Sequence, residues 1–293
     1  MKNIFRFLFI SQCLVVLLDS SSVLSAQNSI DHRLELTAEN VHWGYYDASV
    51  NPVLRIEPGE QVYVETMIAR GVTRLIMAGA DPEGIPPSMM EVEAGVVDRG
   101  PGAHPMTGPI YVEGAEAGDV LAVTIKDIGY LIPFGLSGFL PDGGTLPDDF
   151  PYGGLGYFEL DLENEVAYMR GTDAVIPMRP FFGSIGVAPP VLRGRVSSNP
   201  PGHHTGNLDN KELVVGTTLY LPVHVPGGLL SIGDGHAAQG DGEVSGTAIE
   251  TSMSGVIEVQ LYKDQNLLWP RAETPTHYVS MGSHTDLDEA ARS

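Results

Sequence analysis

Short hydrophobic runs, separated by polar and turn-forming residues, recur along most of the chain. These runs are rich in Val, Ile, Leu and Tyr, as is typical of β-strands. The strands predicted in this way cover residues 54–56, 61–67, 120–128, 214–225, 229–232 and 256–261. Turn signals lie between them, such as EPGE at 57–60, EAGD at 116–119 and VPGG at 225–228. The pattern therefore predicts many short strands joined by turns.

Helical periodicity is scarce. The best helical segment is TDLDEAARS at 285–293, which carries Asp residues near its start but spans only about two turns. Residues 135–156 are dense in Gly, Pro and Asp, and they predict a long surface loop. Together these features predict a mainly β fold, an antiparallel β-sandwich or distorted barrel with few short helices and with its sites on loops.

The N-terminus has the pattern of an export signal. Lys2 and Arg6 precede an apolar run at 7–18. This run is short for a membrane span, and small residues suited to cleavage follow it. We therefore expect residues 1–26 to be a signal peptide, and the remaining protein to be periplasmic or secreted and free of the membrane. Because Cys13 is the only cysteine, the mature chain would lack disulfides, a thiol nucleophile and thiolate zinc ligands.

The charge of the chain limits its partners. Its 293 residues carry 37 acidic against 16 basic side chains, a formal charge of -21 at pH 7. Such a field repels phosphate backbones, which argues against nucleic acid and favours neutral or cationic ligands. With 43% hydrophobic residues the chain is otherwise typical of a globular protein.

The most acidic glycine-rich stretch is LLSIGDGHAAQGDGEVSGTAIE at 229–250. On a strand, Asp234 and His236 would project to the same side, and the glycines between them would leave room for an ion. Asp241 and Glu243 repeat this spacing as a candidate second carboxylate pair. The alternative is an acidic hairpin whose carboxylates are merely solvated; the length of the motif favours a site.

A second cluster is NPPGHHTGNLDNKEL at 199–213. His203 and His204 follow a rigid Pro-Pro-Gly entry, and Asn207 and Asp209 come shortly after. Imidazole with carboxylate is a ligand mixture that suits zinc. An ordinary turn, in which Asn207 and Asp209 bond their own backbone, explains this segment equally well.

A third candidate is VHWGYYD at 41–47, where Trp43 could wall a pocket beside His42. A lone histidine among aromatic residues is more often structural, so composition alone supports this site least. His104 has a similar standing, as a pocket or loop histidine. No nucleophile elbow and no phosphate-binding glycine loop occurs in the sequence.

Five blocks of the sequence resemble, in order and spacing, the acetamidase/formamidase family. They are HWGYYDASVNPVLRIEPGEQVYVET, HPMTGPIYVEGAEAGDVLAVTIKDI, PFFGSIGVAP, GHHTGNLDNKELVVGTTLYLPV and GDGHAAQGDGEVSGTAIE. The resemblance implies a β-sandwich amidohydrolase that splits small aliphatic amides into ammonia and a carboxylate with a divalent metal, commonly zinc. It also implies one catalytic domain over 27–293 that lacks the family's usual C-terminal extension.

The resemblance also assigns residues. Family motif positions fall on His42, Asp209, Asp234, His236, Asp241 and Glu250. From these we expect metal ligation by His42, Asp209, Asp234 and His236. Proton transfer is assigned to Glu250, with Asp241 or Glu243 completing the site and with the roles of Glu250 and Asp241 open to exchange. The expected substrate pocket comprises Asn207, His204, Gln239, Glu243 and Trp43.

Other expectations concern partners and alternatives. Calcium is a candidate second ion, and a homo-oligomer is expected. The alternative function is an exported β-sandwich that binds a metal and a small ligand without catalysis. A calcium-dependent carbohydrate-binding module is disfavoured by His236 and the His203–His204 pair, because such modules use oxygen ligands.

Overall fold

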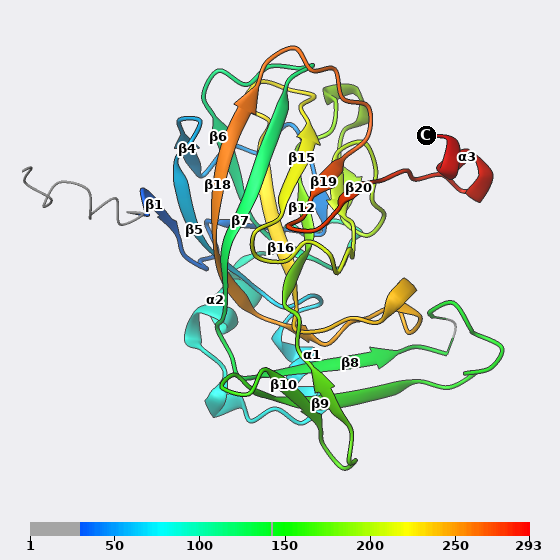
Figure 1. Cartoon of the computed structure of the whole chain (residues 1–293). Helices are drawn as coiled ribbons and strands as arrows, with labels where there is room; N and C mark the ends of the chain where they lie inside the picture. The colour runs from blue at the N-terminus through cyan, green and yellow to red at the C-terminus, as the bar shows by residue number, and fades with distance from the viewer. Residues whose placement is uncertain (1–29, 142) are drawn as a thin grey trace, which may run out of the picture.

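The computed structural model describes residues 30–141 and 143–293, and two large β-sheets form its body (Figure 1). The predicted signal peptide, with Cys13, lies outside the described residues. One sheet has seven strands, in the order β1 (His32–Leu34), β5 (Gln61–Thr66), β18 (Met253–Tyr262), β7 (Val120–Tyr130), β15 (Thr218–Pro222), β19 (Arg271–Glu273) and β20 (Tyr278–Ser280).

The second sheet has eleven strands. Its main path runs through β11 (Val175–Pro177), β10 (Val166–Met169), β9 (Gly154–Asp161), β8 (Phe134–Phe139), β17 (Glu250–Thr251), β16 (Leu230–His236), β12 (Phe181–Gly186) and β14 (Thr205–Asn207). Off this path, β6 (Pro105–Val112) pairs with β16 and also with β2 (Val41–Trp43) and β4 (Leu54–Ile56). A separate ribbon pairs β3 (Tyr45–Tyr46) with β13 (Val196–Ser197).

The main hydrophobic core lies between these sheets. Alternate residues of β5 and β18 are buried, so Val64 and Ile257 of the seven-stranded sheet share one cluster with Phe182, Ile185 and Ile232 of the other. Burying each such side chain contributes about 1.5–3 kcal/mol before conformational entropy is counted. The prediction of a mainly β sandwich is confirmed.

The strands β8, β9 and β10 extend below the sandwich, where α1 (Val72–Ala78) and α2 (Pro87–Gly95) cover them (Figure 1). This region has its own core, which includes Leu75, Met89, Val92, Phe134 and Leu136. Neither helix was predicted. Both are short, and packing of their buried residues rather than helix propensity stabilises them.

The predicted surface loop over 135–156 is wrong in part, because its ends are the paired strands β8 and β9. The strand glycines there, such as Gly135, serve close packing rather than turns. A Cβ on Gly135 would lie 2.5 Å from the carbonyl oxygen of Glu250, so a glycine is required where β8 passes β17.

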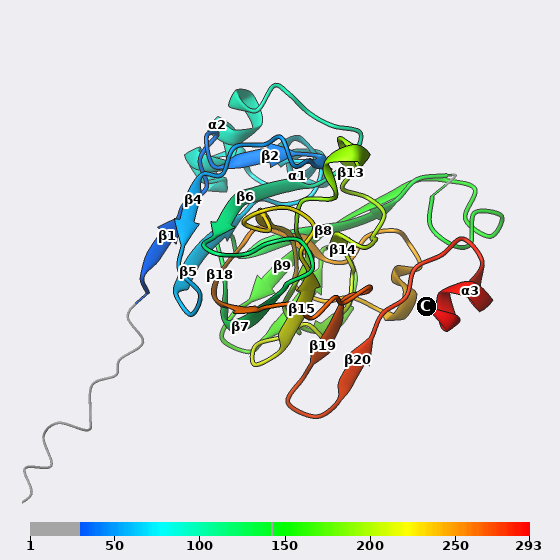
Figure 2. The same cartoon turned by 90° about the horizontal axis from the view of Figure 1, so that it is seen from above.

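Other boundaries differ modestly from prediction. The strand at 54–56 is confirmed as β4, whereas the run at 214–225 forms a strand only at β15. The run at 229–232 continues to His236 in β16, which carries the acidic motif into the sheet. The predicted C-terminal helix is α3 (Leu287–Arg292), which lies apart from the sheets beyond β20 (Figure 2).

Three short 3₁₀ turns complete the fold: η2 (Pro82–Gly84), η3 (Val191–Arg193) and η4 (Asp241–Glu243). Within residues 30–141 and 143–293, no helix is both long and apolar enough to cross a bilayer.

Candidate active site

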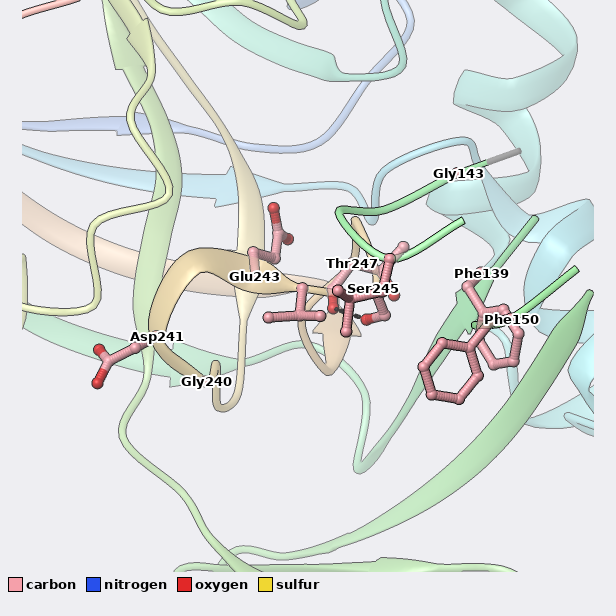
Figure 3. A pocket seen from close by; sticks show the side chains of 10 residues that line it. Phe139, Gly143, Phe150, Gly240, Asp241, Glu243, Ser245 and Thr247 are labelled. Carbon is pink, nitrogen blue, oxygen red and sulfur yellow. Dashed lines mark hydrogen bonds between the residues drawn. The ribbon is translucent and has the colours of Figure 1, made fainter. Parts of the chain in front are cut away.

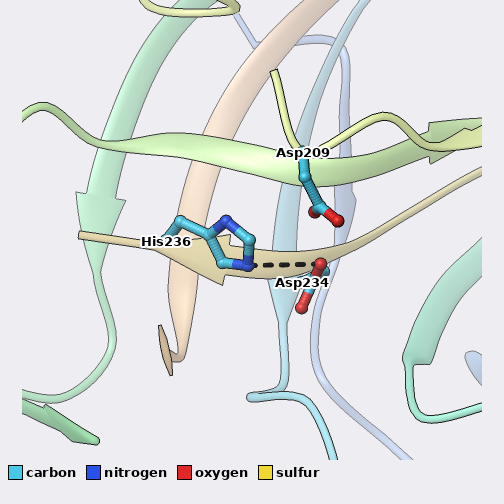
Figure 4. Close-up of side chains that lie close together, drawn as sticks. All are labelled: Asp209, Asp234 and His236. Atoms are coloured by element: carbon cyan, nitrogen blue, oxygen red, sulfur yellow. Dashed lines mark ion pairs between the residues drawn. The ribbon is translucent and has the colours of Figure 1, made fainter. Parts of the chain in front are cut away.

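The site is built around β16, all of whose residues are buried. Asp234 and His236 project to the same side of this strand, as predicted, and Asp234 Oδ2 lies 3.2 Å from His236 Nε2 (Figure 4). Gly233 and Gly235 allow close neighbours: an added Cβ would lie 2.4 Å from the Pro105 carbonyl oxygen or 2.7 Å from Met253 Cγ, respectively. The glycines of the motif therefore pack the strand inside the sheet.

Asp209 reaches the same place from the segment after β14. Its backbone N–H donates to the carbonyl oxygen of Gly183 at 3.1 Å, and Asn207 Nδ2 donates to Asp209 Oδ2 at 2.7 Å. Gly183 of β12 leaves the space that the acids occupy, since an added Cβ would lie 2.5 Å from Asp234 Oδ2 and 2.7 Å from Asp209 Oδ1. A larger residue there would exclude the carboxylate cluster.

Two glutamates complete the surroundings of His236. Glu250 pairs with His236 between β17 and β16, and its Oε2 lies 3.4 Å from His236 Nε2. Its Oε1 accepts a hydrogen bond from the Ala248 backbone N–H at 3.2 Å. Candidate ligand atoms within 4.8 Å of one another form two overlapping groups, Asp209 with Asp234 and His236, and His236 with Glu243 and Glu250.

Several buried atoms of this cluster have no hydrogen-bond partner among the described residues: Asp209 Oδ1, Asp234 Oδ1, His236 Nε2 and Glu250 Oε2. Buried polar atoms are nearly always bonded, and each orphan costs about 1–3 kcal/mol. Carboxylate oxygens with one imidazole nitrogen are ligands for zinc and similar divalent cations. A divalent cation therefore fits this cluster.

Gln239 orients the imidazole of His236. Its Oε1 lies 2.9 Å from His236 Nδ1, and its Nε2 donates to the carbonyl oxygen of Asp209 at 2.6 Å. Because the second bond assigns the amide nitrogen, the amide oxygen faces Nδ1, which must donate. In the neutral ring, the lone pair of Nε2 then points at the carboxylates, as a metal-ligating histidine requires.

Crowding of acids in a buried place perturbs their ionisation. Burial, together with the charge of Asp234, raises the pKa of Asp209 to about 9. Burial also raises the pKa of Glu243 to about 7, with the charge of Glu250 adding to the effect. Burial opposes the charging of His236, but Asp234 and Glu250 outweigh it and raise its pKa well above the usual value. The cluster is short of positive charge, which a cation would supply.

Two predicted residues lie outside this cluster. His42 Nε2 lies 2.9 Å from Ser231 Oγ, and burial lowers the pKa of His42 to about 4, so the ring is neutral. Its nitrogens belong to neither group of candidate ligand atoms. Trp43 is buried in the core beside the helices, with Arg99 stacked on its ring.

The predicted pair of Asp241 and Glu243 diverges, because η4 is a tight turn rather than a strand (Figure 3). The side chain of Asp241 is 88% exposed and contacts Lys211 at 2.7 Å. This places it outside the buried cluster, against the expectation that it completes the site. Of the other predicted pocket residues, Asn207 and Gln239 contact cluster residues, whereas the buried His204 packs on Tyr46.

Further neighbours of the cluster include a histidine whose role the sequence left open and residues that the sequence did not single out. His104 Nε2 lies 3.7 Å from Asp234 Oδ2, so this histidine borders the site. Tyr46 Oη lies 3.1 Å from Ser184 Oγ in the same buried region. For Gly183, the only available signal was its glycine identity inside a hydrophobic run.

A cavity of about 340 Å³ opens beside Glu243 (Figure 3). Its walls join η4 and Val244 to the apolar side chains of Phe139, Leu146 and Phe150. The carboxylate of Glu243 therefore belongs both to the cavity wall and to the group around His236.

Known proteins resemble the chain in sequence and in fold. A sequence model of a protein family, described as Acetamidase/Formamidase family, matches residues 29–193 and 193–276. The formamidase of Methylophilus methylotrophus is 30% identical over 212 residues, covering 55% of this chain and 52% of that protein. The chain spans about half the length of the curated relatives it matches.

Solved structures resemble the chain over a larger share. The acetamidase from Yersinia enterocolitica is 32% identical with a TM-score of 0.73, covering 89% of this chain and 77% of that one. The acetamidase from Bacillus halodurans is 31% identical with a TM-score of 0.72, covering 89% and 80%.

Proposed function

The chain belongs to the acetamidase/formamidase family, and from this premise we propose that it hydrolyses the C–N bond of a small aliphatic amide, releasing ammonia and a carboxylate. One observation carries the proposal: ligand atoms of Asp209, Asp234, His236 and Glu250 converge with no hydrogen-bond partner among the described residues, and Glu243, which belongs to the group around His236, lines a cavity. Structural acids are normally bonded, so this arrangement supports a chemical role.

Asp209, Asp234 and His236 would hold the divalent cation, which we propose to be zinc. When bound, such an ion supplies a Lewis acid that polarises a carbonyl and lowers the pKa of water to about 7. Gln239 accepts from Nδ1 of His236, so that in the neutral ring the lone pair of Nε2 would face the bound cation. Buried Asp209 and Asp234 keep their carboxylates oriented towards the same space.

Glu250 is the proposed proton carrier. The Ala248 N–H fixes one of its oxygens, and the other remains without a partner in the cluster. This oxygen can take a proton from water and pass it to the amide nitrogen, which must be protonated before ammonia leaves. Glu243, with its pKa raised to about 7, offers a second carboxyl group at the cavity wall.

The test is ammonia release from formamide, acetamide and propionamide, with and without chelator, together with metal analysis. We expect turnover that chelator abolishes. Glu250→Gln should keep the metal and lose activity by roughly 10²–10⁴-fold. Asp241→Asn is the matched control, because this exposed carboxylate lies outside the cluster, and it should retain activity. Full activity in Glu250→Gln would refute the proton role.

Metal binding with no ammonia release from any amide would support the alternative, a non-catalytic metal-binding protein. Metal analysis would also separate zinc from calcium, the candidate second ion.

We also propose that the protein is exported and forms a homo-oligomer. The basic and apolar pattern of residues 1–26 supports export. Val191 and Leu192 of η3 are 72% and 101% exposed, which supports a subunit contact there. Cell fractionation with N-terminal sequencing tests the first proposal, and light scattering on the purified protein tests the second.

A further inference from the structure

Two arginines line a cavity that the proposed chemistry does not use. Arg70 lies two residues before the start of α1, and Arg74 lies on α1. Both border a cavity of about 230 Å³ that also includes Gly138, Ser245 and Thr247. The guanidinium of Arg74 lies over Gly138, since a Cβ added to this glycine would be 3.2 Å from Arg74 Nη2.

Neither guanidinium has a hydrogen bond or ion pair within residues 30–141 and 143–293, whereas most other described cations do have a partner. The partnered cations include Arg33, Arg55, Lys126, Arg170, Arg179, Arg195, Lys211, Lys263 and Arg292. Burial lowers the pKa of Arg74, and the charge of Arg70 lowers it further. In a chain with 37 acidic and 16 basic residues, two neighbouring cations without a carboxylate indicate a place for an external anion.

This place lies close to the carboxylate cluster. Glu250 of β17 pairs with Leu136 of β8, and Gly138 lies two residues further along β8, about 7 Å away along the strand. Thr247 ties the segments together, because Gly138 N–H donates to its Oγ1 at 2.8 Å. The Glu250 carboxylate is near enough to raise the pKa of Arg74.

The arginine cavity adjoins the cavity beside Glu243. Phe139, Gly143, Ser245 and Thr247 line both. The two cavities therefore share a wall, and a small molecule bound beside Glu243 would lie next to the cavity of the two guanidinium groups.

We propose that Arg70 and Arg74 form a carboxylate-binding subsite, and that the substrate is a short aliphatic amide with an acidic group at its other end. The proposal rests on the proposed amide hydrolysis. Guanidinium groups bind carboxylates with charge-assisted, often bidentate hydrogen bonds. They would also offset the negative field that otherwise repels an anionic substrate. Formamide and acetamide are too short to gain from this contact.

The experiment compares succinamate with succinamide in the metal-loaded full chain. The two differ only in whether the distal group is a carboxylate or a neutral amide. We expect kcat/KM to be roughly tenfold or more higher for succinamate, mainly through a lower KM. Arg70→Gln and Arg74→Gln should each reduce this preference roughly tenfold while leaving acetamide turnover unchanged.

Arg193→Gln is the matched control, because exposed Arg193 of η3 lines a different cavity and its loss changes the net charge equally. Equal turnover of succinamate and succinamide, unchanged in the arginine variants, would overturn the subsite. Direct binding of succinate against butyrate, measured by calorimetry, provides a readout that needs no turnover. Succinate binding that depends on the arginines, with no cleavage of any amide, would support the subsite. This outcome would contradict only the proposed hydrolysis.

Discussion

Asp119 and Asp234 are both buried carboxylates, with 2% and 1% exposure, but the protein treats them in opposite ways. Asp119, in the turn before β7, accepts bonds from the backbone N–H groups of Glu116 and Asp264 at 2.8 and 2.9 Å and from Lys263 Nζ at 2.6 Å. Asp234 lies among Asp209, His236 and His104, and its Oδ1 has no hydrogen-bond partner within the described part of the chain.

The backbone repeats this contrast. Asp234, Asp209 and Glu243 all have positive φ, at 63°, 45° and 43°, a region that side chains rarely adopt. Strain of this kind costs about 1–3 kcal/mol per residue and tends to gather at functional sites. Asp119 is therefore a structural acid that stabilises a turn, whereas the acids of the cluster are held at a cost that ligand binding can repay.

The sharpest test of this comparison is Asp234→Asn. It should abolish cation binding and reduce amide hydrolysis by roughly 10³-fold, the effect of losing several kcal/mol of electrostatic stabilisation. Measured in chelator, the free energy of unfolding should also fall, because the buried charge of Asp234 pairs with His104 and His236, which outweigh its burial and hold its pKa below the usual value. Chemical denaturation and ammonia release measure the two effects; full turnover in the variant would refute the distinction.

Gln239→Leu tests the orientation of the imidazole. Without the acceptor at Nδ1, the ring of His236 loses its fixed tautomer, and metal affinity or activity should fall about 10–100-fold. Gln265→Leu is the matched control, since Gln265 also donates to a backbone carbonyl but lies far along the chain at an exposed turn. Unchanged metal affinity in Gln239→Leu would show that the ring needs no such partner.

Asp119→Asn should lose stability but keep metal binding and activity, unlike Asp234→Asn. Losing charge-assisted hydrogen bonds should lower the free energy of unfolding by about 2 kcal/mol, while metal content and activity of the folded enzyme stay unchanged. Urea denaturation and ammonia release check the pair of outcomes. A loss of activity without a loss of stability would contradict the structural role.

The smallest effect is the pH dependence of that stabilisation. Burial tends to raise the pKa of Asp119, but the bonds from Lys263 and the two backbone N–H groups outweigh it and hold the pKa below its usual value. The folded state thus binds fewer protons. The stabilisation is therefore present above the pKa of the unfolded state, about 3.9, and is lost as the pH falls through the pKa of the folded state. The difference between wild type and Asp119→Asn should shrink on acidification, as measured by denaturation at several pH values.

Much of the architecture could be predicted from the sequence. Short runs such as 54–56 and 120–128 specify strands locally, because a strand's apolar pattern depends on its own residues. The Asp234–His236 pair was also predictable, since the two-residue period of a strand places both side chains on one face. The glycines of β8 misled the prediction because the sequence does not tell a turn glycine from one that makes room for another strand.

By itself, the sequence determined a β-rich chain with a strong acid excess and with the residue types of a metal-assisted site on one strand. Only the tertiary structure decided which acids meet. Asp209 joins Asp234 because Gly183 leaves room between β12 and β16, and Asp241 departs because η4 turns it towards Lys211. Likewise, the net charge of -21 does not reveal Arg70 and Arg74, which have no partner within the described residues. A net charge says nothing about where the charges lie, and the fold alone determines which side chains come close enough to pair.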